Sequence, residues 1–506
     1  MSKSISETYD VAIIGGGING AVSAARLAAS GIKVLLVEKN DFASTTSQES
    51  SNLVWGGIKY LQSYEFSLVY KLCASRNELL REYPNRIRQI GFLASLGPTA
   101  PFGKFLGLLG TTLYWTIGKF ATNPPKVFSA MRAQQIEPAF LPGRAALEYF
   151  DAYLPDNDSR FVWEFISTAK QLGADCRNYQ QLEGASFDGL WNLEIRGTLT
   201  GEASTARAKV LINATGPFAN QLSNLLELKT RSQLVLSKGV HLVVPKIHKT
   251  DHVLAFWDEQ GRMFYVIPMH DRSVIGTTDT RVGNETKEVT EEDREFLLRQ
   301  INKEMNLERP LTKDDILAER CGVRPLVTSS NGAAEPDWHK LSRKHAVELD
   351  AKRKAISIFG GKLTDCLNVG EEVIAEVEKL GVKAKSNKSQ KWFGEESAAA
   401  KAKFVQRASS VLANASEAEL VIESLWRRHG SEALSILDLI EAQPESADSV
   451  FDGLGITFAE IDYVLRNEDV QTPEDLLRRR LPIAMSRSKA EIESNQRLNV
   501  VLGQLH

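Results

Sequence analysis

The most constraining feature of the sequence is a glycine-rich turn between two apolar runs near the N-terminus. Residues 11–14 predict a short strand, residues 21–30 a helix of small side chains, and residues 33–38 a second strand. The glycines of the turn, spaced G-x-G-x-x-G, are Gly15, Gly17 and Gly20. This pattern is typical of a βαβ dinucleotide-binding unit, in which the helix N-terminus holds a pyrophosphate.

The residues around this turn indicate how a dinucleotide would be held. Ile18 and Asn19 lie inside the turn, and Glu38 ends the second strand, where its carboxylate can accept hydrogen bonds from ribose hydroxyls. Lys39 follows directly. An acid at this position argues against a 2′-phosphate, and hence against NADP, but it does not separate NAD from FAD.

Composition bounds the remaining options. The chain has 506 residues, a formal net charge of −3 and 43% hydrophobic residues, which suits two or three globular domains and gives no reason to expect nucleic-acid binding. The four cysteines are far apart, so we expect neither a metal site nor a disulfide framework. The polar N-terminus and the lack of about 18 consecutive apolar residues predict a cytoplasmic protein without a spanning helix.

One segment, residues 91–120, is unusually apolar and rich in glycine in its second half. Two interpretations compete: a buried helix near the active site, or an interfacial segment that contacts lipid. Composition alone favours the buried helix.

Two later turns repeat the features of a nucleotide site. An apolar run over residues 208–213 ends in Ala214, Thr215 and Gly216, whose small side chains suit close approach of a nucleotide. A β-prone run from residue 356 leads into a second such turn. Its candidate cofactor residues are Gly361, Lys362, Leu363 and Thr364. The loop after Glu38 offers further hydroxyls and flexible backbone at Thr46, Ser47, Ser50, Ser51, Gly56 and Gly57.

With these motifs in view, the sequence resembles the FAD-dependent glycerol-3-phosphate dehydrogenases, within the D-amino-acid-oxidase-like flavoproteins. The resemblance rests on IIGGGINGA, on S-x-x-SS-x-L-x-x-GG-x-x-YL at residues 47–61 and on YEF at residues 64–66, and it extends along essentially the whole chain. It implies FAD as cofactor and oxidation of sn-glycerol 3-phosphate to dihydroxyacetone phosphate. Electrons would pass to a membrane quinone, or to oxygen as in an oxidase branch of the family.

The resemblance also implies a fold of class α/β (α+β) with three parts. A Rossmann-like FAD domain (about 8–75, 145–225 and 350–385) would interleave with an antiparallel-sheet substrate domain (about 76–144 and 226–349). Residues 386–506 would form an all-helical C-terminal domain.

The resemblance assigns the substrate site residue by residue. It directs Arg324 and Arg343 at the substrate phosphate, since a buried dianion needs two or more cations. Lys59 and Tyr60 would assist, and Thr278 could hydrogen-bond substrate or flavin. The candidate catalytic residues are Arg324, Lys362 and His241, and the sequence does not rank the last two as handlers of the hydroxyl proton.

Three departures from the family pattern fall among the residues around this candidate substrate site. Lys59 replaces a usual arginine, Trp55 a common histidine, and Asp365-Cys366-Leu367 the usual Thr-Tyr-Arg. They leave FAD binding intact but keep three alternatives open: another polyol phosphate as substrate, an amino acid as substrate, or a flavoprotein without catalysis. The resemblance makes a peripheral position on the inner face of the plasma membrane as plausible as a buried role for residues 91–120. The oligomeric state stays open, with a homodimer among the options.

Overall fold

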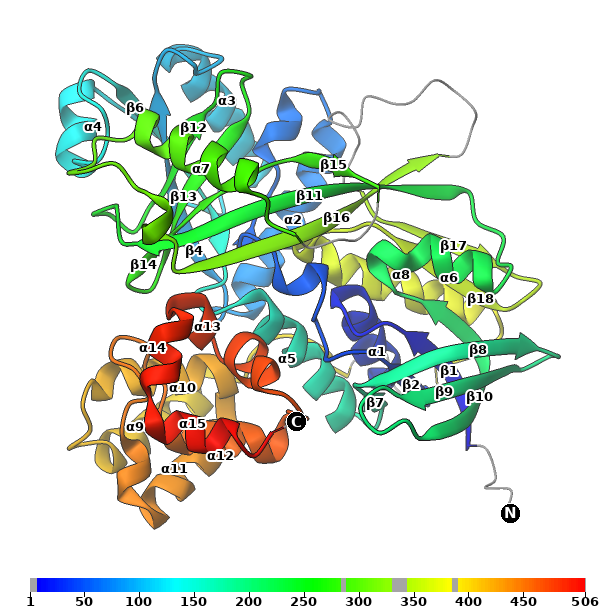
Figure 1. The fold of residues 1–506 in the computed structure, drawn as a ribbon. Coiled ribbons are helices and arrows are strands. Elements are labelled where there is room, and N and C mark those ends of the chain that lie inside the picture. Colours follow the sequence, from blue (N-terminus) through cyan, green and yellow to red (C-terminus); the bar gives the residue numbers. More distant parts are fainter. Residues whose placement is uncertain (1–6, 284–287, 330–343, 385–389, 506) are drawn as a thin grey trace.

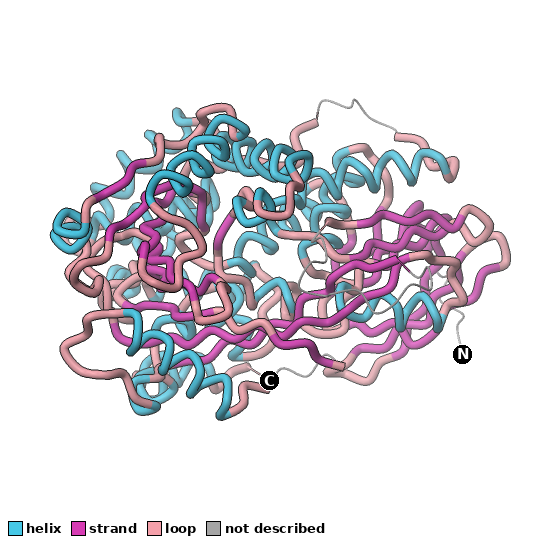
Figure 2. The backbone as a smooth tube through the Cα atoms, turned by 90° about the horizontal axis from the view of Figure 1, so that it is seen from above, coloured by secondary structure: helices cyan, strands magenta, loops and turns pink. Residues whose placement is uncertain are grey.

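The computed structural model describes residues 7–283, 288–329, 344–384 and 390–505. The described chain forms two sheets and a C-terminal group of helices that lies against both (Figure 1). From above, the strands gather along the middle of the molecule with helices on either side (Figure 2). This arrangement matches the predicted class of two interleaved sheet units and a helical C-terminal unit.

The first sheet is parallel in its centre and carries the glycine-rich turn. Its central strand β1 pairs with neighbours on both sides over Val11–Ile14, which suits the continuous apolar sequence of that half. The order is β17 (Ala346–Asp350), β18 (Ala355–Phe359), β10 (Ala203–Asn213), β1 (Glu7–Ile14), β2 (Val34–Val37) and β7 (Asp175–Arg177), with β9 (Trp191–Gly197) on β10 and β8 (Gln180–Phe187) on β9.

Three helices cover one face of this sheet: α1 (Ile18–Ala29), α5 (Asp158–Gln171) and α8 (Cys366–Lys379). The small residues of α1 allow the turn, helix and sheet to pack closely. A side chain at Gly20 would place its Cβ 1.9 Å from the Gly15 carbonyl oxygen, and Gly15 itself has a φ of +108°. Both positions therefore require glycine.

The second sheet is larger and mostly antiparallel. Its path is β15 (Thr280–Val282), β11 (Ser232–Pro245), β14 (Arg272–Gly276), β13 (Met263–Met269), β12 (Val253–Trp257), β4 (Arg88–Leu96), β6 (Ala145–Tyr153) and β3 (Leu53–Val54), with β16 (Ala318–Ser329) on β11 and β5 (Lys126–Phe128) on β6. Helices α4 (Ala130–Ile136) and α7 (Glu291–Glu304) cover one face. Helices α2 (Phe66–Glu82) and α3 (Lys104–Ile117) lie on the other.

Strand pairing divides some of the ranges expected for the FAD and substrate domains between the two sheets. Strand β6 was expected in the FAD domain, which was to resume at residue 145, but it pairs with β4 in the second sheet. Strand β3 also belongs there, while β17 pairs in the first sheet although residues up to 349 were expected in the substrate domain. An apolar strand has the same sequence pattern in either sheet, so the pattern does not predict which strand it pairs with.

Strands β11 and β16 form a long antiparallel ribbon that reaches from the second sheet toward the first (Figure 1). The register pairs His241 with Arg320 and Ser237 with Arg324. This ribbon carries two arginines into the space between the sheets.

The prediction of a buried helix within residues 91–120 is wrong for most of that segment. Residues up to 96 belong to β4, and in α3 only Gly107, Thr111 and Tyr114 are buried. Four of its large apolar side chains, Phe105, Leu106, Leu109 and Leu113, are exposed, Phe105 by 83% and Leu106 by 58%.

The C-terminal unit is helical, as expected. Its apolar core is built from α9 (Ala398–Val411), α10 (Ala418–His429), α11 (Ala433–Ala442), α12 (Phe458–Asn467), α13 (Ile483–Ser486), α14 (Lys489–Ser494) and α15 (Gln496–Leu502). A turn of π-helix, residues Asp475–Arg480, lies between α12 and α13. All six residues of this turn are buried.

Candidate flavin and substrate site

A cavity of about 290 Å³ opens at the N-terminus of α1. The first glycine turn forms one wall and the Ala214–Gly216 turn after β10 forms the other. The predicted residues that line it are Gly15, Gly17, Ile18, Asn19, Glu38, Lys39, Thr46, Ser47, Ala214, Thr215, Gly216 and Gly361. Turns distant in the sequence therefore meet at one place, as the motifs indicated.

The α1 N-terminus is open toward this cavity. No side chain caps the helix at Gly17, and a Cβ there would lie 3.2 Å from the Ser47 hydroxyl oxygen. The Ile18 N–H donates to that hydroxyl at 3.0 Å. Backbone N–H groups and the helix dipole at this end favour a bound anion.

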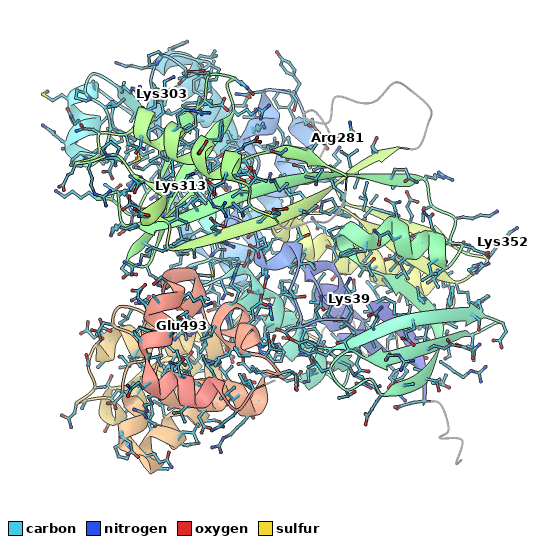
Figure 3. All side chains as sticks on the ribbon, viewed as in Figure 1. Lys39, Arg281, Lys303, Lys313, Lys352 and Glu493 are labelled. Atoms are coloured by element: carbon cyan, nitrogen blue, oxygen red, sulfur yellow. The ribbon has the colours of Figure 1, made fainter. Side chains whose placement is uncertain are left out.

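Glu38 lies at the cavity wall with both carboxylate oxygens bonded to backbone. It accepts from the Gly16 N–H at 2.7 Å and from the Asn40 N–H at 3.0 Å. Burial raises the pKa of this carboxyl, although the two N–H donors oppose the effect. Lys39, labelled in Figure 3, places its Nζ 4.1 Å from the Phe218 ring centroid across the cavity mouth.

A second cavity of about 550 Å³ continues from the first, because Ile18, Thr46, Ser47, Pro325 and Gly361 line both. Its wall carries both acidic and cationic side chains, and Glu49 and Asp279 are the acids. The four cationic side chains on its wall are Lys59, Arg262, Arg324 and Lys362.

Arg324 is held at this wall by two neighbours from the turn after β14. Its Nη2 donates to the Thr277 hydroxyl at 2.8 Å, and its Nη1 lies 3.4 Å from an Asp279 carboxylate oxygen. The guanidinium is only partly exposed. A planar fork fixed in this way can present its remaining N–H donors to an anion in the cavity.

Lys362 follows Gly361, whose φ of +107° turns the chain into the cavity. Its Nζ lies 4.3 Å from the Tyr60 ring centroid and 5.6 Å from that of Trp55. The two aromatic faces position the ammonium by cation–π attraction. Trp55 thus serves as a wall of the site where the family commonly has histidine.

Other predicted residues do not line this cavity. His241 is 1% exposed, lies behind Gly276, and has no hydrogen-bond partner for either ring nitrogen among the described residues. Burial, and the charges of Arg320 and Arg324, hold the pKa of His241 well below its ordinary value, so the ring is neutral. Thr278 is also buried, and its hydroxyl accepts from the Val240 N–H at 3.0 Å.

The remaining predicted residues divide into three groups. Ser50, Ser51, Lys59, Leu363 and Thr364 line the second cavity. Neither cavity is lined by Gly20, Gly56, Gly57 or Tyr60, which lie in the layer around the cavities. Gly56 is packed closely there, because a Cβ at this position would lie 2.2 Å from the Tyr114 hydroxyl oxygen. Arg343 lies outside the described residues.

Three residues of the second cavity were missed from the sequence. Thr277, rather than Thr278, lies at the wall, and Asp279 supports Arg324. Arg262 comes from the hairpin between β12 and β13. Thr277 and Asp279 are the chain neighbours of the predicted Thr278, and which of the three side chains faces the cavity depends on strand pairing that the sequence does not show.

The structure also explains the Asp365 departure. This carboxylate does not line the cavity and instead bonds His345 Nδ1 at 2.7 Å, with Asn368 and Ser75 completing its partners. Burial acts to raise the pKa of Asp365, but the hydrogen bond and charge of His345, together with the bonds from Asn368 and Ser75, outweigh burial and lower the pKa. The extra negative charge is thus compensated outside the substrate cavity.

The two joined cavities fit a flavin dinucleotide. The uncapped helix end and the two glycine turns suit a pyrophosphate, and the second cavity has space for a ring system beside the Gly361–Thr364 turn. Residues 10–341 match the family described as FAD dependent oxidoreductase. The chain belongs to this family.

Other comparisons match the C-terminal part or most of the length of this FAD-dependent oxidoreductase to proteins that are named for glycerol 3-phosphate or alpha-glycerophosphate. Residues 389–505 match the family described as the C-terminal domain of alpha-glycerophosphate oxidase. The aerobic glycerol-3-phosphate dehydrogenase of Escherichia coli K12 is 32% identical over 74% of this chain and 74% of its own length. The glycerol-3-phosphate dehydrogenase of Pseudomonas aeruginosa is 29% identical over 97% and 94%.

A solved structure shares the fold of this oxidoreductase. The glycerol-3-phosphate dehydrogenase from Bacillus halodurans, complexed with FAD, is similar with a TM-score of 0.74 at 24% identity, covering 98% of this chain and 90% of that one. Within the described residues, no helix is long and apolar enough to cross a membrane. Those residues also hold no group of three or more metal-ligating side chains.

Proposed function

We propose that this FAD-dependent enzyme oxidises sn-glycerol 3-phosphate to dihydroxyacetone phosphate and passes the electrons to a quinone. The observation that carries the proposal is the cluster of Lys59, Arg262, Arg324 and Lys362 on a cavity continuous with the nucleotide cavity. A phosphate dianion leaving water needs such compensating charge, which a neutral polyol would not. The names of the similar proteins support the same substrate.

The chain's own residues would bind and orient the substrate. Arg324 would bind the phosphate, with Arg343 as a second cation, and Lys59 and Arg262 would attract it from the open side. Phosphate held at this end would direct the secondary alcohol toward Lys362 and the flavin ring. Bound FAD supplies the two-electron acceptor for the hydride.

Lys362 is the stronger candidate for handling the hydroxyl proton. It lines the cavity, whereas His241 lies behind the wall with its pKa depressed. Thr278 is better assigned to fixing the β11–β14 turn than to substrate binding.

The test is reduction of the bound flavin under strictly anaerobic conditions. Glycerol 3-phosphate should bleach the flavin absorbance, while glycerol, and amino acids such as glycine or proline, should not. Inorganic phosphate should slow the bleaching by competition. Bleaching by an amino acid alone would replace the proposal with an amino-acid oxidase.

A lipid surface is part of the proposal, because a membrane quinone must be reached. The α3 apolar surface, formed by Phe105, Leu106, Leu109 and Leu113, is 43% to 83% exposed. Lys104 and Lys119 flank it and suit anionic headgroups. A peripheral position on the membrane follows, with a homodimer through the same surface as the competing explanation.

A further inference from the structure

The segment after β2 is held by the C-terminal helices as well as by its own sheet. We name residues 41–48 the cofactor loop. It carries Thr46 and Ser47, which line both cavities, and Ser47 accepts the Ile18 N–H at the start of α1. The position of this loop therefore sets the geometry of the pyrophosphate end of the site.

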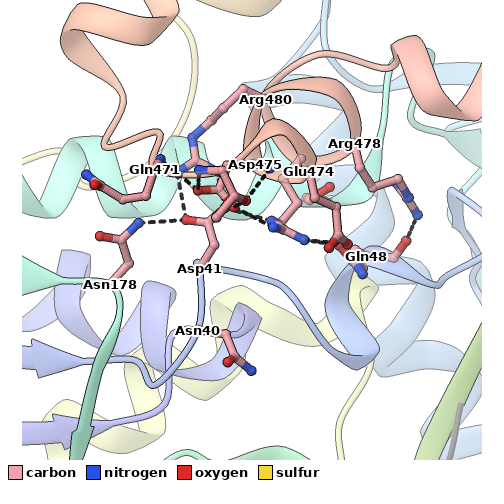
Figure 4. A network of polar contacts seen from close by, with 12 residues as sticks. Asn40, Asp41, Gln48, Asn178, Gln471, Glu474, Asp475, Arg478 and Arg480 are labelled. Carbon is pink, nitrogen blue, oxygen red and sulfur yellow. Dashed lines mark hydrogen bonds and ion pairs between the residues drawn. The ribbon is translucent and has the colours of Figure 1, made fainter. Parts of the chain in front are cut away.

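Three consecutive arginines of the Asp475–Arg480 turn bond this loop, and Figure 4 labels the first and the last of them, Arg478 and Arg480. Arg478, Arg479 and Arg480 are only 8%, 3% and 1% exposed. Burial of three adjacent cations is costly unless each finds an anion or several acceptors. The partners they find determine what the turn does.

The first end of the cofactor loop is held through Asp41. Arg480 bonds both carboxylate oxygens of Asp41, at 2.8 and 2.9 Å, and Arg479 adds a bond at 2.7 Å. Asn178 donates to the same carboxylate at 2.9 Å. Asp41 is fully buried, so these bonds form without competition from water.

The second end is held through Gln48. Arg479 donates to its side-chain oxygen at 3.1 Å, and Arg478 donates to its backbone carbonyl. Arg320 of β16 donates to that carbonyl as well, at 3.0 Å. The carbonyl belongs to the residue directly after Ser47, so the arginines restrain the hydroxyl that meets α1.

We propose that Arg478, Arg479 and Arg480 form an arginine clamp through which the C-terminal helices hold the cofactor loop and retain FAD. They are positioning residues: none lines either cavity, and their effect passes through Gln48 and Ser47. Opening the clamp would leave Asn178 at one end of the loop and Arg320 at the other, and would loosen the position of Ser47 at the α1 N-terminus. The inference depends on FAD binding and not on the identity of the substrate.

Arg478→Met is the informative variant. It keeps side-chain length and apolar packing but removes the donors, and Arg320 still satisfies the Gln48 carbonyl. The matched control is Arg427→Met. Arg427 is 6% exposed and crosses the same interface to Asp156, which keeps Arg428 as a second partner, but it does not contact the loop.

The holoenzymes are diluted, and release of FAD is followed by the rise in flavin fluorescence. Loss of a hydrogen bond to a charged donor predicts about tenfold faster release from Arg478→Met. Arg427→Met should remain within about twofold of the wild type, even if both variants unfold at similarly lowered temperatures. Hydrogen exchange should rise in residues 41–48 only in Arg478→Met, and Arg478→Lys should recover most of the retention.

Equal release rates in the two methionine variants, or an unchanged rate in Arg478→Met, would overturn the clamp. If Arg478→Met gives no folded holoenzyme, Asp41→Asn tests the clamp at the other end of the loop, where Arg479 and Arg480 bind, with nearly the same side-chain shape. It should also release FAD faster than wild type, and a wild-type rate there would equally overturn the proposal.

Discussion

Arg324 shows how a single side chain in the site depends on geometry as well as charge. Its two terminal nitrogens are used separately, one for Thr277 and one near Asp279. A lysine offers one compact charge and cannot bond both neighbours while facing the cavity. Position and orientation of the cation are therefore coupled.

We accordingly expect Arg324→Lys to raise KM for glycerol 3-phosphate about tenfold, because the loss of a charge-assisted bond is of that size. FAD content should be unchanged, since Arg324 does not line the nucleotide cavity. Steady-state kinetics and the ratio of flavin to protein absorbance measure the two quantities. Arg299→Lys on the outer surface of α7 is the control, and equal KM values in both variants would remove Arg324 from the substrate site.

Arg262 should act in a weaker and more general way. It is exposed and makes no ion pair within the described part of the chain. Exposed charges contribute little, so Arg262→Ala should raise KM only about two- to fivefold. The effect should shrink as salt is added, because screening already weakens the wild-type attraction. A salt-independent change would instead indicate direct contact or altered hairpin structure.

The roles that the sequence indicates most directly are local ones. Gly15 and Gly20 are required by backbone geometry inside one motif, and their spacing alone indicates it. His241 and Asp365 depend on which strand or helix packs against them. Alternation along β11 could not show that His241 lies behind Gly276, nor could any spacing pair Asp365 with His345.

Helix α3 is the element whose sequence and environment disagree most. Leu106, Leu109 and Leu113 recur at helical spacing on one face, yet that face is uncovered within the described chain. The sequence predicts an apolar helix here, but it does not predict which face of the helix packs against the rest of the chain. Tyr114 and Gly107 face inward and leave the leucines outside.

Replacing Leu109 and Leu113 together with Glu should abolish flotation of the enzyme with vesicles that contain anionic lipid. Oxidation measured with a soluble dye acceptor should persist, because α3 lines neither cavity. Leu199→Glu, at an apolar residue 44% exposed elsewhere, is the control. Retained flotation would reject the lipid surface. A change from dimer to monomer without any wild-type flotation would assign the face to a second copy.

Across the whole molecule, the C-terminal helices are joined to the sheets by buried ion pairs rather than by apolar contact alone. Asp156 binds Arg427 and Arg428, and Glu468 binds Arg160 of α5. Although burial acts to raise it, the Arg160 charge lowers the pKa of Glu468 to about 2. The pKa of Asp156 is also well below its ordinary value, because Arg427 and Arg428 outweigh burial.

These lowered pKa values predict that the stability of the interface decreases as the pH falls. A carboxyl whose pKa is lower in the folded protein stabilises the folded state at any pH above its pKa in the unfolded chain, which is about 4.5 for Glu468. That stabilisation is lost as the pH falls toward the pKa of the carboxyl in the folded protein. The wild-type unfolding temperature should therefore fall steeply between about pH 5 and pH 3. Glu468→Gln should unfold at a lower temperature near neutral pH, because Arg160 loses its anion, but its unfolding temperature should decline less on acidification.

Thermal scans at matched rates measure how steeply the unfolding temperature of each protein falls with pH, with Glu441→Gln at an exposed pair as control. Parallel slopes in wild type and Glu468→Gln would mean that acid acts elsewhere, and that this bridge does not set the acid limit of the assembled fold.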